Sequence, residues 1–415
     1  MPNLVRGLML SCGLLACGAG GAADLPAAGV PRCVADTAGL SGVERRLLAL
    51  PADSWLALPG TAFRKFCEAN AVPALEANGG CRMAVEAWSG GVFDDERRQM
   101  LVIGGGHMDY WGNEVYAFAP ASGRWRIVRP ASRVASGALP SEPMPDGAPV
   151  SRHTYDSLAY MRHLGQMFLF GGAIAPNGYS ENTTWWFDPA NARWQPKASA
   201  PRSGVGHYYM ATAYDPLTQQ VYIRNERGFY AYDPASDRWS WPLVDFSVRP
   251  YYPRQQTHHY RRAVVMPEAR LFVALGGMLA NPAAPDVFIY DLERKRDVTP
   301  DYPMRGDLSV IANQGVGLDV DTASGALVAW AGGAPAIMDP QSWEWRRGSA
   351  RGAPPKAVGN GTFGRWRYIP YLNVFMLVNK PEEDVHFYKL TAGCGPAAPA
   401  DARRRERPAE TTLSR

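Results

Sequence analysis

Histidines that recur at a regular position are the residues of this sequence best suited to chemistry. His153, His207 and His258 coincide when similar segments of the chain are superposed with offsets of 54 and 105 residues. An imidazole titrates near neutral pH, so it can take up or donate a proton, and several imidazoles together can hold a transition metal. The sequence therefore predicts a histidine cluster at the mouth of a central channel, if the fold brings the three segments together.

The same superposition extends the cluster into other segments. Gln314 takes the position in a later segment, Glu86 takes it in an earlier one, and Asn360 or Gly361 takes it in the last. A metal ion at this position would use His153, His207 and His258 as ligands, with Gln314 or Glu86 as a further ligand. The chain has no short metal-binding motif, so general acid–base chemistry needing no cofactor is the other interpretation.

A second candidate is the loop GGGHMDYWGNE, which begins at Gly104. It follows an apolar run, and functional residues favour loops on a rigid scaffold. Structural roles are the alternative, with acidic and amide side chains capping the turn and the indole packing on a neighbour. The side chains of this loop that are expected to bind or convert a ligand are His107, Asp109, Tyr110, Trp111 and Asn113.

Basic and aromatic residues accompany these positions. The net charge of +4, from 43 Lys+Arg and 39 Asp+Glu, is too small for a general nucleic-acid binder. Lys and Arg nevertheless predominate in the connections beside the histidines. A guanidinium group binds carboxylates bidentately, and a phenol ring has an apolar face and a polar tip. The residues expected to bind an acidic ligand or to assist the histidines are Arg152, Arg202, Arg224, Arg254, Lys380, Tyr155 and Tyr208.

An internal repeat supplies the elements that must position these side chains. One pattern appears as YAFAPASGRW from Tyr116, as WWFDPANARW from Trp185 and as YAYDPASDRW from Tyr230, with weaker copies later in the chain. Apolar runs that end in Gly-Gly precede most copies. Each unit therefore predicts four short antiparallel strands in roughly 40 to 50 residues, which is the size of a β-propeller blade.

The repeat resembles the kelch repeat and the central domain of galactose oxidase. The resemblance covers about residues 85–390 and implies an all-β propeller of six blades, with seven as the alternative. The segment SWLALP from Ser54 is expected to pair with the last blade and close the ring. The copper chemistry of galactose oxidase needs a cysteine within the propeller. The processed chain has none inside the repeats, so this activity is not expected.

The two ends of the chain carry separate signals. Residues 1–23 predict a secretory signal, cleaved either before Asp24 or at a lipobox that would leave Cys17 lipidated. Residues 24–85 would hold the closing strand and an insertion, residues 86–394 the propeller, and residues 395–415 a disordered tail. Four cysteines outside the signal allow three pairings, of which we expect Cys67–Cys81 and Cys33–Cys394.

These features favour an exported enzyme, periplasmic, secreted or anchored to the outer membrane, that acts on an acidic polysaccharide. β-Elimination beside a uronic acid needs a cation for the carboxylate, a base and an acid. Arg152, Arg202 or Arg224 would supply the cation, and His153, His207 or His258 with Tyr155 or Tyr208 the others. Lyases of ulvan and oligogalacturonate are propellers with such residues on one face, which is a likeness of fold alone.

Two other functions use the same residues. A propeller without catalytic activity could bind a glycan or a protein at the cell envelope, since kelch propellers include many scaffolds. A narrow pocket, in contrast to an open groove, would favour the isomerisation or mutarotation of a small acidic sugar. No nucleic-acid partner is expected, and contact with a membrane would come only through a lipid on Cys17.

Overall fold

The computed structural model describes residues 39–72, 75, 77–135, 138–180, 182–200, 210–225, 227–246, 260–277 and 286–392, and the structural statements below concern these residues. The predicted signal segment, the predicted pair Cys33–Cys394 and the predicted tail lie outside them. Within them, no helix is both long enough and apolar enough to cross a membrane.

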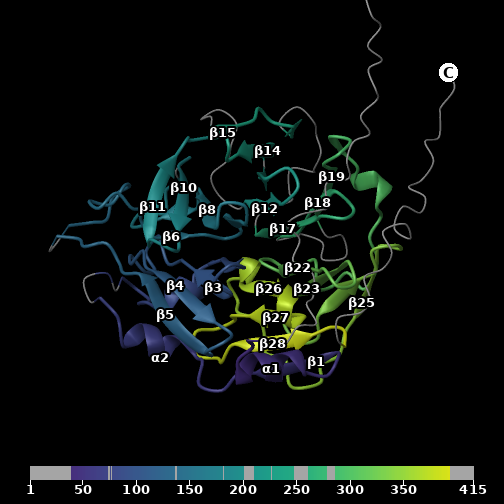
Figure 1. The fold of residues 1–415 in the computed structure, drawn as a ribbon. Helices are drawn as coiled ribbons and strands as arrows, with labels where there is room; N and C mark the ends of the chain where they lie inside the picture. Colours follow the sequence, from purple (N-terminus) through teal and green to yellow (C-terminus); the bar gives the residue numbers. More distant parts are fainter. Residues whose placement is uncertain are drawn as a thin grey trace, which may run out of the picture.

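Six antiparallel sheets follow one another round a ring, which confirms the predicted six-bladed β-propeller (Figure 1). The strands of each blade are given from the channel outward. Blade one consists of β2 (Gly91–Asp94), β3 (Gln99–Val102), β4 (Val115–Ala119) and β5 (Arg124–Arg129), and blade two of β7 (Leu158–Met161), β8 (Gln166–Phe170), β10 (Thr184–Asp188) and β11 (Arg193–Lys197). Blade three consists of β12 (Ala211–Asp215), β13 (Gln220–Arg224), β14 (Gly228–Asp233) and β15 (Arg238–Trp239).

The other three blades complete the ring. Blade four consists of β17 (Arg261–Met266), β18 (Leu271–Gly276), β19 (Val287–Asp291) and β20 (Arg296–Asp297), and blade five of β22 (Gly317–Asp321), β23 (Ala326–Trp330), β24 (Ala336–Met338) and β25 (Glu344–Arg347). Blade six consists of β26 (Trp366–Ile369), β27 (Val374–Leu377), β28 (His386–Lys389) and β1 (Ser54–Ala57). The innermost strands lie side by side round the channel, and β26 returns to β2. Short added strands are β16 (Val244–Asp245) beside β14 and β21 (Arg305–Gly306) beside β25.

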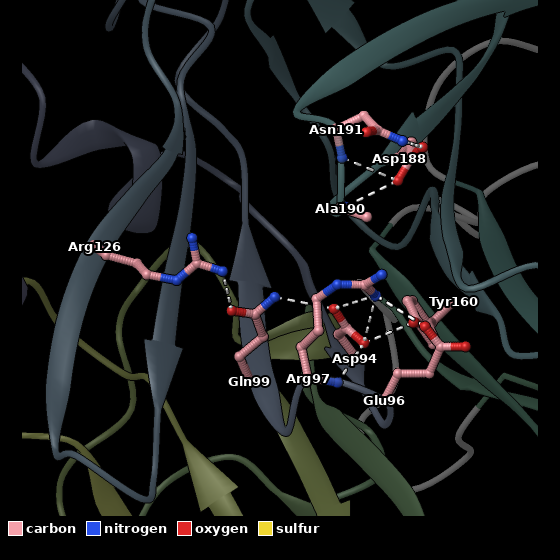
Figure 2. Close-up of polar contacts among 9 residues, drawn as sticks. All are labelled: Asp94, Glu96, Arg97, Gln99, Arg126, Tyr160, Asp188, Ala190 and Asn191. Atoms are coloured by element: carbon pink, nitrogen blue, oxygen red, sulfur yellow. Dashed lines mark hydrogen bonds and ion pairs between the residues drawn. The ribbon is translucent and has the colours of Figure 1, made fainter.

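The repeated Asp-Pro element forms the turn between the third and fourth strands of a blade. In blade two, the Asp188 carboxylate accepts hydrogen bonds from the backbone N–H groups of Ala190 (2.8 Å) and Asn191 (3.3 Å), as Figure 2 shows. Trp194 is the second residue of the outer strand β11, and its ring packs on that of Phe187, with centroids 4.9 Å apart. An aspartate that binds the backbone next along the chain is a turn signal with a physical cause, which explains why this motif predicted the blades.

Neighbouring blades are held together by apolar faces and by buried polar contacts. Trp330 of blade five stacks on Trp366 of blade six, with centroids 6.2 Å apart. Between blades one and two, the Tyr160 hydroxyl donates to Asp94 (2.6 Å), whose other oxygen accepts from the Gln99 amide (2.9 Å; Figure 2). Apolar clusters of this kind lie between successive blades, so the core is divided among the blade interfaces.

The strand from the N-terminal region closes the ring, as predicted. Strand β1 pairs antiparallel with β28, and Ser54 lies opposite Lys389 (Figure 1, purple beside yellow). Trp55 points into the interface between blades five and six, with its ring 5.7 Å from that of Trp366. Joining the two ends of the chain in one blade removes the free sheet edge that a last blade would otherwise expose.

Helices of the N-terminal region pack beside blades one and six. They are α1 (Gly42–Leu48), α2 (Phe63–Glu68) and α3 (Met83–Glu86). The predicted disulfide Cys67–Cys81 is confirmed, and it joins α2 to the segment just before α3. Helix α1 was not expected from the sequence. It begins with a capping box, in which Ser41 and Glu44 bind each other's backbone N–H groups, so Ser-Gly-Val-Glu was its signal.

Candidate functional site

The candidate site lies on the face of the ring that carries the loops between second and third strands and the connections between blades. We call this the upper face. The connection from blade one to blade two contains β6 (Arg152–His153), which pairs with β9 (Ala173–Ile174). This ladder fixes the backbone of His153, so its ring has a defined direction.

Glycine allows the loop of blade one to reach this connection. Gly106 has a φ of +75°, and a Cβ there would lie 2.3 Å from the Cα of Arg152. Only a residue without a side chain allows so close an approach. The approach brings the loop that carries His107 and Asp109 against His153.

Three side chains form a chain of polar contacts at this point. Nε2 of His153 lies 2.7 Å from Oδ2 of Asp109, and Nδ1 lies 3.4 Å from the hydroxyl of Tyr155. An ionised carboxylate only accepts, so Nε2 is the donor toward Asp109 and Nδ1 faces Tyr155 as an acceptor. His153 and Tyr155 are each 4% exposed, whereas the Asp109 side chain is 21% exposed. Asp109 thus orients an imidazole that can accept a proton from a phenol.

His107 adds an exposed imidazole to the chain. Its ring lies edge-on to that of His153, with centroids 5.9 Å apart. The indole N–H of Trp111 donates to the backbone carbonyl of His107 (2.8 Å), which holds the loop in place. A Cβ on Gly178 would lie 2.6 Å from the His107 ring, so the loop of blade two also bounds this imidazole. His107 is therefore positioned to meet a ligand before His153 does.

The same residues could hold a divalent transition metal. One ligand atom each from His107, Asp109 and His153 lies within 4.8 Å of the others. Two imidazoles and one carboxylate suit Zn²⁺ and similar ions, and a fourth position would be left for water or substrate. A metal on Nε2 of His153 would replace its hydrogen bond to Asp109. Metal binding and proton relay are thus alternative uses of one cluster.

A set of equivalent residues surrounds the channel beneath this cluster. The residues that precede the inner strands of five blades all have positive φ, from 46° at Tyr155 to 61° at Tyr260. They are Trp88, Tyr155, Tyr260, Gly315 and Phe363. The N–H of Tyr155 donates to the carbonyl of Trp88, that of Gly315 to Tyr260, and that of Phe363 to Gly315. We call these residues the collar, since the same backbone contact links successive blades.

The collar's rings fill the upper end of the channel. Tyr155 lies 5.8 Å from Tyr260 and 6.1 Å from Phe363, so it contacts rings from blades four and six. Phe363 is fully buried, while Trp88 and Tyr260 are half-buried. The ring of Trp88 also lies 5.0 Å from that of His153. The histidine cluster therefore lies against the aromatic rings of the collar.

Two of the predicted ligand-binding arginines lie inside the protein. Arg152 is fully buried and makes two 2.8 Å hydrogen bonds to the carboxylate of Glu142. Arg224 is 1% exposed, lies 4.0 Å from Asp286 and is covered by the ring of Phe246. A buried guanidinium needs such a partner, so both side chains are held in structural contacts.

Other residues of the predicted loop are also internal. Tyr110 is fully buried and donates to Glu114 (2.7 Å), and burial, followed by the charges of Tyr116 and Glu114, raises the pKa of its phenol. Asn113 is 1% exposed, donates to Ser132 and accepts from its backbone N–H. These side chains hold the loop that presents His107 and Asp109.

The remaining predicted residues lie at the rim or outside the described chain. Gln314 donates to the carbonyl of Gly359 (3.0 Å), Glu86 pairs with Arg82 (2.6 Å), and Lys380 lies 3.4 Å from Glu383. None of these three contacts involves a residue of the His153 cluster. The predicted positions that fall outside the described residues are Arg202, His207, Tyr208, Arg254 and His258, and the ring of histidines stays a prediction.

Comparison with protein-family models finds no match, and comparison with curated proteins finds no similar sequence. The chemistry of the site therefore rests on its own residues. The sequence does contain a signal for the collar, because the offset of 105 that superposes His153 on His258 also superposes Tyr155 on Tyr260. Trp88 and Phe363 belong to the segments in which Glu86 and Asn360 or Gly361 take the position of His153.

Proposed function

We propose that this protein is an exported enzyme that cleaves an acidic, uronic-acid-containing polysaccharide by β-elimination on the upper face. The observation that carries the proposal is the contact chain from Asp109 through His153 to Tyr155. A carboxylate that orients an imidazole, which in turn faces a second proton-bearing group, is the arrangement that general acid–base catalysis requires.

The proposed reaction needs no group beyond those of the chain and the substrate. Tyr155, with its proton passed to Nδ1 of His153, removes the hydrogen on the carbon that bears the uronic carboxylate. The electrons of that C–H bond form the new carbon–carbon double bond, and the bond to the glycosidic oxygen breaks. The leaving oxygen takes up a proton from the imidazolium of His153 or from His107. One unsaturated end and one hydroxyl end result.

The exposed groups around the cluster fit a sugar chain with a carboxylate. Trp88 and Tyr260 present half-buried rings, and Tyr179 is 67% exposed in the loop beside His107. Such rings can stack on the apolar face of a sugar. Arg152 and Arg224 are enclosed, and the exposed imidazole of His107 would instead donate to the carboxylate.

Export belongs to the same proposal. Its support is the predicted signal in residues 1–23 together with the disulfide Cys67–Cys81, because disulfides persist in oxidising compartments. A polysaccharide substrate outside the cytoplasm agrees with such a location.

A second candidate function is glycan binding without catalysis. The observation in its favour is burial: His153 and Tyr155 are each 4% exposed, so the rings and His107 make up the accessible surface. In that case the polar chain would only rigidify the loop, and a ligand would be bound and left unchanged.

Ultraviolet absorbance distinguishes the two functions. The protein is mixed with polysaccharides of galacturonic, glucuronic, mannuronic and guluronic acid, and the appearance of unsaturated ends is followed. The expected result is rising absorbance with one of them, lost in His153→Ala and retained in His163→Ala, whose histidine stacks on Tyr214 beside a turn of blade two. Binding without absorbance change across the panel would favour the binding protein.

A further inference from the structure

A cavity occupies the channel below the collar, on the opposite face from the histidine cluster. Its volume is about 110 Å³, and the inner strands of all six blades line it. Its walls continue down to Asp95, Arg162 and Thr322, which lie in or beside the turns that follow three inner strands. We call it the lower cavity, and it opens toward these turns.

Three polar groups of the lower cavity are buried without a partner. They are the hydroxyl of Thr212, Nε of Arg262 and Nε of Arg367, contributed by blades three, four and six. Thr212 and Arg262 are each 1% exposed. A buried donor that lacks an acceptor costs about 1–3 kcal/mol, so three in one cavity call for an explanation.

The rest of each arginine is firmly held. Asp156 accepts from Nη1 of Arg262 and from the N–H groups of Thr212 (3.0 Å) and Ala263 (2.8 Å). Burial raises the pKa of Asp156 to about 6, so this carboxyl is ionised at neutral pH. Nη1 of Arg367 lies 3.7 Å from Asp319. The network fixes the guanidinium groups and leaves their Nε–H groups free to donate.

Charged side chains of both signs line the cavity, and each arginine lies beside a carboxylate. The charged side chains that line it are Arg162, Arg262 and Arg367 against Asp95 and Asp319, and Asp156 lies behind Arg262. Burial, together with the charge of Arg262, lowers the pKa of Arg367 to about 10, because the two cations repel each other. An acceptor with negative charge would relieve this repulsion and form a strong hydrogen bond with any of the three donors that it reaches.

We propose that the lower cavity binds a small carboxylate, of the size of acetate or glycolate. Its volume of about 110 Å³ well exceeds the roughly 15 Å³ that one water molecule needs by this measure, so the cavity has room for a ligand of a few heavy atoms. Guanidinium groups bind carboxylates in preference to neutral groups. The site does not depend on the proposed function, because none of His107, Asp109 and His153 lines the lower cavity.

Calorimetric titration tests this site with acetate, glycolate and sulfate, against chloride at matched ionic strength. We expect saturable binding of at least one carboxylate. Thr212→Val, which keeps the shape of the side chain, should weaken it about tenfold, as expected for one hydrogen bond to a charged group. Arg367→Gln should weaken it further, whereas Arg296→Gln on an outer strand should leave it unchanged.

Two results of this titration would contradict carboxylate binding in the lower cavity. Heat signals equal to those of chloride, or equal binding by wild type and Thr212→Val, would overturn the proposal and leave water as the occupant. Circular dichroism of each variant shows that the fold is kept. Asp109→Asn should bind the carboxylate normally, so loss of polysaccharide cleavage in that variant is distinguishable from failure at the lower cavity.

Discussion

Nε2 of His153 and Oδ2 of Asp109 lie 2.7 Å apart, although they belong to separate segments of the chain. The contact depends on Gly106, whose missing side chain lets the loop of blade one approach the connection to blade two. The contact therefore couples the first two blades, and it gives the imidazole a fixed orientation with Nδ1 directed at Tyr155.

Replacing Asp109 by Asn should lower the rate of polysaccharide cleavage by about 100-fold or more and leave the fold intact. The amide can present an N–H to Nε2, which would favour the opposite tautomer of His153 and remove the acceptor from Tyr155. Steady-state kinetics would measure kcat and KM for Asp109→Asn.

Asp301→Asn is the matched control, because this carboxylate is exposed and lies far along the chain in a 3-10 turn. A rate within twofold of wild type in Asp109→Asn would mean that this carboxylate only holds the loop.

Chelation should not affect the proposed reaction. The relay uses protons alone, so wild-type activity should stay within twofold after dialysis against a metal chelator, and metal analysis of active protein should find less than one equivalent. Loss of activity on chelation, with recovery on addition of Zn²⁺, would instead assign His107, Asp109 and His153 as metal ligands.

Phe363→Ala should destabilise the protein by about 3–5 kcal/mol, because Phe363 is fully buried in the collar and its loss opens a cavity. Denaturant unfolding would measure the change. Tyr179→Ala, in which an exposed ring is removed, should change the free energy of unfolding by less than about 0.5 kcal/mol. Similar values for both variants would show that the collar is not a packed layer.

Closure of the ring can be tested through the tryptophan of β1. Trp55→Ala should cost about 3–5 kcal/mol, since this ring packs on Trp330, Trp366 and Tyr388 between blades five and six. Trp241 is 79% exposed, so Trp241→Ala is the control and should have little effect. If both variants melt at the wild-type temperature, strand β1 is not needed to close the propeller.

The lysine opposite Ser54 predicts a dependence of stability on pH. Lys389 is 1% exposed, its ammonium donates to the carbonyl of Leu48 (2.8 Å), and burial lowers its pKa to about 8. Between pH 8 and 10.5 the unfolded chain therefore binds more protons here than the folded chain, so stability rises with pH. The gain approaches about 3 kcal/mol at most.

Unfolding curves at several pH values would show this gain as a difference between wild type and Lys389→Met. The variant lacks the amine, so it should lack the rise. Lys295→Met, which changes an exposed lysine, should keep it. Parallel curves for wild type and Lys389→Met would mean that this amine titrates as it does in water.

The blades could be predicted from the sequence because their signals are local. Asp188 binds the backbone of its own turn, and the alternation of the strands needs no distant partner. Strand β1 was predicted by its apolar pattern and the lack of an outer strand in the last blade. Helix α1 was missed although Ser41 and Glu44 form a capping box, since its surroundings resemble a linker.

The candidate site was predicted only in part because it depends on contacts between blades. The loop with His107 and Asp109 was recognised, but its contact with His153 follows from the close approach at Gly106. Arg152 sits beside His153 in the sequence and looks like a surface residue. In the structure it is buried against the carboxylate of Glu142, which lies 10 residues earlier in the same connection, and no local pattern predicts this pair.

Digestion in heavy-oxygen water distinguishes β-elimination from hydrolysis. Mass spectrometry of the products would show whether solvent oxygen enters the chain at the cleaved bond. β-Elimination should give shortened chains with an unsaturated end and no heavy oxygen, and Tyr155→Phe should give no products. Heavy oxygen in the products would identify hydrolysis. Intact polysaccharide throughout the uronic-acid panel would leave the upper face as a binding surface. Either result would contradict the proposed β-elimination.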